Sequence, residues 1–126
     1  MYLVDTNVFL EVLLNQEKRG VCKDFLSLNA GNLYITDFSL HSIGIILFRN
    51  NKEEIFQKFL SDIIAHIKII TLKEASYKDL VEIRRFFKLD FDDAYQYKVA
   101  MIYDLEIVTM DMDFEKIKGK TRVLFL

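Results

Sequence analysis

The sequence predicts an α/β fold, with a central parallel sheet of about five short strands and helices on both faces. Short apolar runs alternate along the chain with longer amphipathic segments, which is typical of βαβ units. The chain has 126 residues, a length that fits one domain. It is 52% hydrophobic and contains 11 Phe and 6 Tyr, which is ample for a buried core.

Five short apolar runs are interpreted as the strands. The first, Tyr2-Leu3-Val4, stops at Asp5, and the second precedes Thr36 and Asp37, either of which is a suitable helix N-cap. Strands buried on both faces read as short runs rich in Val, Ile and Leu. The five runs cover residues 2–4, 33–35, 67–70, 106–109 and 122–125.

Six segments between these runs are interpreted as helices. Asp5, Thr6 or Asn7 is a suitable N-cap for the first, and Asn29-Ala30-Gly31 is a stop signal for the second. The six helices are expected at residues 8–14, 19–28, 37–48, 52–64, 73–87 and 92–103. The side chains expected to be available to the core from the fifth helix are Ala75, Leu80, Ile83, Phe86 and Phe87.

Charge and cysteine content exclude several classes of protein. Seventeen basic and nineteen acidic residues give a net charge of -2, so nothing attracts nucleic acid globally. The single Cys22 excludes an internal disulfide and a multi-cysteine zinc site, and a reduced, cytoplasmic setting is expected. No apolar run approaches the ~18 residues of a membrane span. The GxxxxGK phosphate loop is absent.

Acidic residues follow two of the predicted strands. Asp5 comes directly after the first strand, and Asp111 follows the fourth. In a parallel sheet, ligands bind beyond the carboxyl ends of the strands, so both carboxylates should lie at one edge. Asp92 and Asp93 begin a helix, and Asp113 lies two residues after Asp111. Carboxylates are the oxygen ligands that Mg²⁺ prefers, so this group predicts a divalent metal site.

Each acidic segment also has an ordinary structural interpretation. Asp5 alone can be a helix N-cap or a turn former. Asp92 and Asp93 can stabilise the start of a helix through its dipole. The segment from Asp111 to Asp113 can be a polar turn. The combination of three acidic segments with these strand and helix contexts favours the metal site.

At these residues the sequence resembles the PIN-domain family, and within it the short toxin-like proteins of the VapC type. The resemblance covers essentially the whole chain, so residues 1–126 are expected to form a single PIN-like domain. It implies a three-layer sandwich and Mg²⁺- or Mn²⁺-dependent cleavage of RNA. It rests on three motifs: Val4-Asp5-Thr6-Asn7, Asp92-Asp93-Ala94, and Thr109, Asp111, Asp113 and Phe114 in TMDMDF.

The resemblance also implies roles for individual residues. Asp5, Asp93 and Asp111 match catalytic, metal-binding acids, and Asp113 matches a supplementary metal-binding acid. The polar residues expected to support the site are Asn7, Asp92 and Thr109.

The helix after the second strand departs from the family pattern. Members usually carry a Glu there, but the best alignment places Ser42 at that position, and no Glu lies between Glu17 and Glu53. Serine cannot replace the charge of a carboxylate. Asp37 and His41 are four residues apart and can share a helix face, so they are candidates for a substitute ligand or proton-transfer group.

Two functions follow from these observations. The first is a toxin-like, metal-dependent endoribonuclease that hydrolyses RNA phosphodiester bonds. The second is a degenerate PIN fold that binds RNA or protein without cutting, which the absent Glu favours. The resemblance further implies RNA as a partner, a small antitoxin-like protein and a homodimer. The lack of a long apolar run predicts no membrane association. The residues considered for contacts to the RNA backbone are Arg84, Arg85, Lys88, Lys98, Lys116, Lys118 and Lys120.

Overall fold

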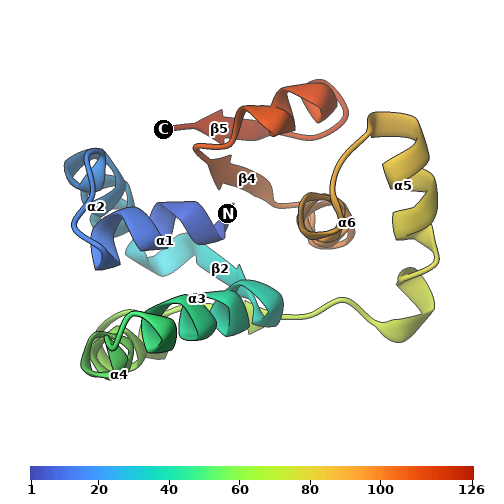
Figure 1. Ribbon diagram of the computed structural model, residues 1–126. Coiled ribbons are helices and arrows are strands. Elements are labelled where there is room, and N and C mark those ends of the chain that lie inside the picture. Colours follow the sequence, from blue (N-terminus) through green and yellow to red (C-terminus); the bar gives the residue numbers. More distant parts are fainter.

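A five-stranded, fully parallel sheet runs through the centre of the molecule in this computed structural model, which describes all residues 1–126 (Figure 1). The strand order is β3-β2-β1-β4-β5. The α/β class and the five-stranded parallel sheet predicted from the sequence are therefore confirmed. The strands are β1 (Tyr2–Val4), β2 (Leu33–Thr36), β3 (Lys68–Ile70), β4 (Glu106–Thr109) and β5 (Val123–Phe125).

Helices cover both faces of this sheet (Figure 1). One face carries α1 (Thr6–Leu13), α2 (Arg19–Leu28), α3 (Asp37–Arg49) and α4 (Glu53–Asp62). The other face carries α5 (Asp79–Phe87), α6 (Phe91–Tyr103) and the 3-10 helix η4 (Met112–Ile117). Three shorter 3-10 helices complete the chain: η1 (Ala30–Asn32), η2 (Ile64–His66) and η3 (Glu74–Ser76). No helix is both long enough and apolar enough to span a membrane.

Two hydrophobic cores lie on opposite faces of the sheet. Successive side chains of a strand point to opposite faces. Leu3 and Ile107 accordingly join the core under α5 and α6, whereas Val4 and Val108 join the core under α1 to α4. All four side chains are at most 1% exposed, so the central strands are apolar throughout, as a sheet covered on both faces requires.

The order of the strands reverses at β1. From β1 the chain first crosses to β2 on one side, and it later returns to β4 on the other side. β1 pairs with β4 in the register Tyr2 to Glu106, Leu3 to Ile107 and Val4 to Val108. The pairing continues one residue further, where the Asp5 amide donates to the Val108 carbonyl at 2.9 Å. The ends of β1 and β4 thus form the topological switch point of the sheet.

The fifth predicted helix is shorter than the sequence suggested. The prediction covered residues 73–87, but the chain forms η3 first and α5 begins only at Asp79. Ala75 and Phe86, expected in the core, are exposed, Phe86 by 76%. Leu80, Ile83 and Phe87 form the apolar stripe at spacings of three and four, and Phe86 lies about 100° around the helix from Phe87.

Truncation of a core aromatic should destabilise the fold far more than truncation of this exposed one. Phe59 is 1% exposed and packs edge-on against Phe9, with ring centroids 5.4 Å apart. Phe59→Ala should lower the free energy of unfolding by about 3–5 kcal/mol, because it leaves a cavity. Phe86→Ala should change it by no more than about 0.5 kcal/mol. Urea unfolding measures both, and equal losses would contradict this assignment of the core.

Candidate metal centre

Asp5 lies at the end of β1, where its carboxylate accepts four hydrogen bonds. Its Oδ1 accepts from the Thr6 amide at 2.8 Å, which caps α1, and from Gln96 Nε2 at 3.3 Å. Its Oδ2 accepts from Thr109 Oγ1 at 2.8 Å and from Asn7 Nδ2 at 3.2 Å. The side chain is 8% exposed, and these four donors replace the water that burial removes.

Thr109 and Asn7 connect Asp5 to the loop after β4. The hydroxyl of Thr109 donates to Asp5 and accepts from the Asp111 amide at 2.9 Å. Asn7 Oδ1 accepts from the Met110 amide at 3.3 Å. Both side chains therefore hold the end of β4 against the end of β1, and they fix the start of the loop that presents Asp111.

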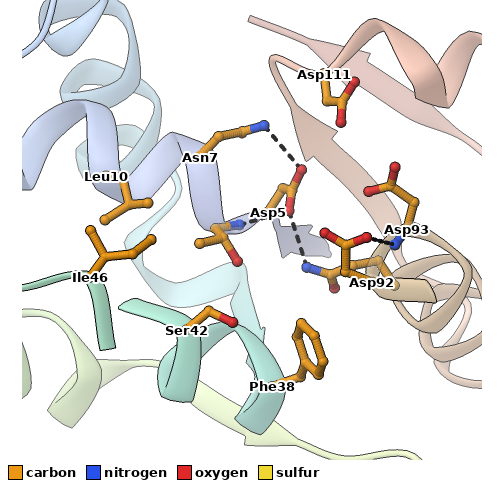
Figure 2. Close-up of a pocket in the computed structure, with 11 residues that line it drawn as sticks. Asp5, Asn7, Leu10, Phe38, Ser42, Ile46, Asp92, Asp93 and Asp111 are labelled. Carbon is orange, nitrogen blue, oxygen red and sulfur yellow. Dashed lines mark hydrogen bonds between the residues drawn. The ribbon is translucent and has the colours of Figure 1, made fainter. Parts of the chain in front are cut away.

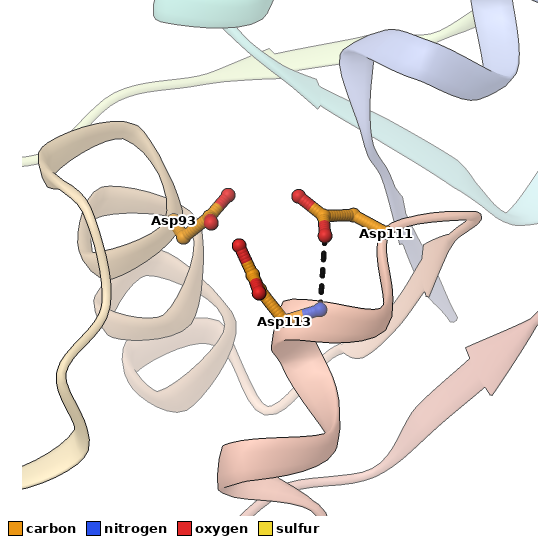
Figure 3. A group of neighbouring side chains, drawn as sticks. All are labelled: Asp93, Asp111 and Asp113. Carbon is orange, nitrogen blue, oxygen red and sulfur yellow. Dashed lines mark hydrogen bonds between the residues drawn. The ribbon is translucent and has the colours of Figure 1, made fainter.

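Asp93, Asp111 and Asp113 form the closest group of carboxylates (Figure 3). One oxygen of each lies within 4.8 Å of the other two. Asp93 projects from the first turn of α6, while Asp111 caps η4 by accepting from the Asp113 amide at 2.9 Å. Side chains from two distant segments thus point into one space, with Asp93 buried, Asp111 half-buried and Asp113 exposed.

A pocket of about 330 Å³ opens between these acids and α3 (Figure 2). Asp5, Asp92, Asp93 and Asp111 contribute its acidic side. The remaining lining residues come from α1, α3 and α6, and they are Thr6, Asn7, Leu10, Phe38, Ser42, Ile46 and Gln96. We call this space the acidic pocket.

Burial and mutual repulsion raise the pKa values of the two buried acids. The pKa of Asp93 rises from 3.8 to about 7, mainly through burial and then through the negative charges of Asp92, Asp111, Asp5 and Asp113. Burial also raises the pKa of Asp5, although its hydrogen bonds from Thr109, Thr6 and Gln96 act in the opposite direction. The cluster is therefore electrostatically strained, and a cation placed among the carboxylates would relieve that strain.

The donor set fits a hard divalent cation. The grouped ligand atoms are carboxylate oxygens alone, without a histidine nitrogen or a cysteine sulfur. Mg²⁺ and Mn²⁺ prefer such oxygen ligands, whereas zinc and copper favour nitrogen or sulfur. The amide nitrogen of Gln96 is bonded to Asp5, and its amide oxygen is buried without a hydrogen-bond partner.

The structure brings together most of the residues singled out from the sequence. Asp5, Asn7, Asp92, Asp93 and Asp111 line the acidic pocket, with Thr109 bonded to Asp5 and Asp113 grouped with Asp93. Ser42, aligned with the usual Glu of the family, lines the pocket too (Figure 2).

Asp37 and His41 lie outside the acidic pocket. They line a separate groove of about 540 Å³ on α3 and α4, whose other lining residues include Ile45, Phe48 and Phe56. The Asp37 carboxylate accepts from the Tyr95 hydroxyl at 3.0 Å. The two do share one helix face, but that face is not turned toward the acids, so we assign neither residue to the metal site.

Gln96 and Ser39 belong to the site and were missed in the sequence. Gln96 Nε2 donates to Ser39 Oγ at 2.8 Å as well as to Asp5. It therefore connects α6 to α3 and to the residue that follows β1. Both residues are at most 3% exposed. Asp93 and Gln96 are three residues apart and so share one face of α6. This spacing could have identified Gln96 as a site residue from the sequence.

Solved structures with the same fold come from several bacteria, whereas no curated protein matches the sequence significantly. A toxin-antitoxin complex from Klebsiella pneumoniae is 22% identical over 98% of this chain and 96% of that chain, with a TM-score of 0.77. VapC20 from Mycobacterium tuberculosis is described as a sarcin-ricin loop cleaving toxin. It is 14% identical over 94% of this chain and 95% of that chain, with a TM-score of 0.80. A chain of VapBC2 from Rickettsia felis, in a structure with a promoter DNA fragment, is 18% identical over 98% of this chain and 97% of that chain, with a TM-score of 0.78.

These identities are low, so the structures establish a shared VapC-like fold. The sequence itself supplies the family. The model of the family described as PIN domain matches residues 2–120, which include the ends of β1 and β4 and the start of α6. The chain belongs to the PIN-domain family.

Proposed function

We propose that the protein is a toxin-like endoribonuclease that uses Mg²⁺ or Mn²⁺ to hydrolyse phosphodiester bonds of RNA. The observation that carries this proposal is the group formed by Asp93, Asp111 and Asp113, whose oxygens lie within 4.8 Å of one another beside Asp5. Membership of the PIN-domain family and a VapC-like fold support the nuclease class. The metal, the RNA substrate and the toxin-like role are parts of the proposal.

Asp93, Asp111 and Asp113 are the ligands that we assign to the metal. When bound there, a divalent metal supplies Lewis-acid chemistry and offsets negative charge on a phosphodiester. Asp5 adds negative charge to this group, and Asn7 and Thr109 fix its position. Because four donors occupy its oxygens, Asp5 can become a direct ligand only by giving up one of those hydrogen bonds. Asp92 contributes further negative charge next to Asp93.

A binding module without nuclease activity is the second candidate, and Ser42 is the observation that favours it. Ser42 leaves the α3 side of the acidic pocket without a carboxylate, since Ile46, the next lining residue on α3, is apolar. Under this alternative the protein binds Mn²⁺ and RNA but cuts nothing. Incubation of the purified protein with RNA and Mn²⁺ separates the two candidates.

An antitoxin-like protein partner and a homodimer are further parts of the proposal. The Klebsiella structure is a toxin-antitoxin complex, and the Rickettsia structure is VapBC2 with promoter DNA. A partner gene beside this one and the molar mass of the purified protein would test these two statements. A cytoplasmic setting stays a prediction.

Asp93→Asn should abolish most of the RNA cleavage. Asparagine keeps the shape of the side chain but lacks the charge that a metal ligand contributes, and we expect a loss of about 100-fold or more. Gel analysis of labelled RNA with Mn²⁺ measures the rate. Asp104→Asn is the matched control, because Asp104 is exposed at the end of α6 and should leave cleavage unchanged. If Asp93→Asn cuts RNA as fast as this control, the proposed nuclease site is wrong.

The metal-free protein should lose stability as pH rises from about 4 to about 7. The folded chain holds a proton on Asp93, whose pKa is raised from 3.8 to about 7, while the unfolded chain has already released it. The raised pKa of Asp5 acts in the same direction. Thermal unfolding in a chelator measures the trend, and Asp93→Asn should flatten it. The same pH slope in both proteins would contradict the pKa assigned to Asp93.

A further inference from the structure

Three aromatic side chains form a continuous row that begins in the acidic pocket and ends on the surface. Phe38 lines the pocket and lies 6.2 Å from Phe91, measured between ring centroids. Phe91 lies 6.5 Å from Tyr77 in turn. Phe91 is 56% exposed and Tyr77 is 44% exposed, so both present apolar ring surface to water. We call these three residues the aromatic row.

A buried tyrosine packs against two of the three rings of the aromatic row. Tyr95 is 1% exposed and lies 5.3 Å from Phe38 and 6.0 Å from Tyr77, between ring centroids. Its hydroxyl donates to Asp37 and accepts from the Leu72 amide at 2.9 Å. Phe38 and Tyr77 therefore pack against a fixed ring, and a ligand that covers these two side chains would cost little side-chain entropy.

One residue of the aromatic row stands next to two of the acids on α6. Phe91 is the first residue of α6, and Asp92 and Asp93 follow it directly. Figure 2 shows Phe38 rising from α3 toward the same pocket that Asp92 and Asp93 line from α6. If an RNA places a phosphodiester at the acids, the adjacent nucleotide would therefore lie next to these rings.

The charges around the site favour ring contacts over phosphate contacts as the source of affinity. The net charge is -2, and several basic residues of α5, α6 and η4 are already in ion pairs. Arg84 pairs with Asp90 at 3.1 Å, Lys98 with Asp79 at 3.2 Å, and Lys116 with Asp113 at 3.9 Å. Aromatic side chains bind nucleobases by stacking whatever the sequence, at about 1–3 kcal/mol per base.

We propose that the aromatic row stacks unpaired bases of single-stranded RNA beside the phosphodiester that enters the acidic pocket. This inference rests on the proposed function and assigns base-stacking residues to the same site. Bases in a duplex already stack on one another and are not free to cover a protein ring. Unpaired bases are therefore the ligands of the aromatic row, with the exposed Phe91 and Tyr77 as the principal stacking residues. Arg84 lines the groove beside both rings, where it is paired with Asp90.

Binding of a short single-stranded RNA that carries a fluorescent purine analogue tests the proposal. Ca²⁺, another oxygen-binding cation, would replace Mn²⁺ so that the RNA stays intact. The wild type should quench the analogue, because stacking quenches it. Phe91→Ala should weaken binding by about 5- to 100-fold and abolish the quenching. Tyr77→Ala is the second variant and should likewise weaken binding. Phe91→Trp keeps an aromatic ring at this position and should therefore retain both the RNA affinity and the quenching.

Phe86→Ala is the matched control, because Phe86 is an exposed aromatic on α5 outside the aromatic row. It should bind the RNA with unchanged affinity. A duplex of the same sequence should bind more weakly than the single strand, and Phe91→Ala should not weaken it further. Circular dichroism of Phe91→Ala and Tyr77→Ala establishes that each variant is folded.

Three results would overturn the proposal. The first is unchanged affinity and quenching in both alanine variants while RNA cleavage persists, which would leave the nuclease proposal intact. The second is an equal loss in Phe86→Ala. The third is a change from dimer to monomer in Phe91→Ala or Tyr77→Ala while the RNA affinity stays unchanged. This result would assign the aromatic row to contact with a second copy of this chain. Conversely, quenching without any cleavage would support the stacking site and sink the nuclease activity.

Discussion

The parallel pairing of β1 with β4 is the constraint on which the candidate site depends. It sets the end of the first strand beside the end of the fourth, although about a hundred residues separate them in sequence. The Asp5 amide continues the ladder by donating to Val108, and the Thr109 hydroxyl then bonds to the Asp5 carboxylate. A slip of one residue would turn Asp5 and Thr109 to opposite faces and separate Asp5 from the loop that carries Asp111.

The acidic group opposes the stability that this pairing provides. Burial and like charges raise the pKa of Asp93 to about 7, so about half of the metal-free molecules carry a proton on Asp93 at neutral pH. Buried ionised acids are tolerated only where donors or cations compensate them. Asp5 has four donors, whereas Asp93 has no side-chain donor and faces Asp111 and Asp113. This contrast is why we assign the metal to Asp93 and its neighbours and a supporting position to Asp5.

The sequence predicted the sheet and most of the acids because both depend on local patterns. Short apolar runs marked all five strands, and the acids that follow β1 and β4 had to meet at one edge. It did not reveal Gln96, whose bonds to Asp5 and Ser39 cross three elements. The sequence also suggested Asp37 and His41 as site residues, because spacing alone cannot show which face of α3 is turned toward the acids. The length of α5 was overestimated because Ala75 was counted with the apolar residues of the helix, whereas residues 74–76 form the 3-10 helix η3 and bury no side chain.

The most direct test of the central claim is the position of a bound metal. Crystals grown with Mn²⁺ and measured at its absorption edge would reveal the ion by anomalous scattering. We predict a peak between the carboxylates of Asp93, Asp111 and Asp113, within ~2.0–2.3 Å of one oxygen of each. The peak should disappear in crystals of Asp93→Asn. A saturating Mn²⁺ concentration that gives no peak at these three residues would contradict the assignment.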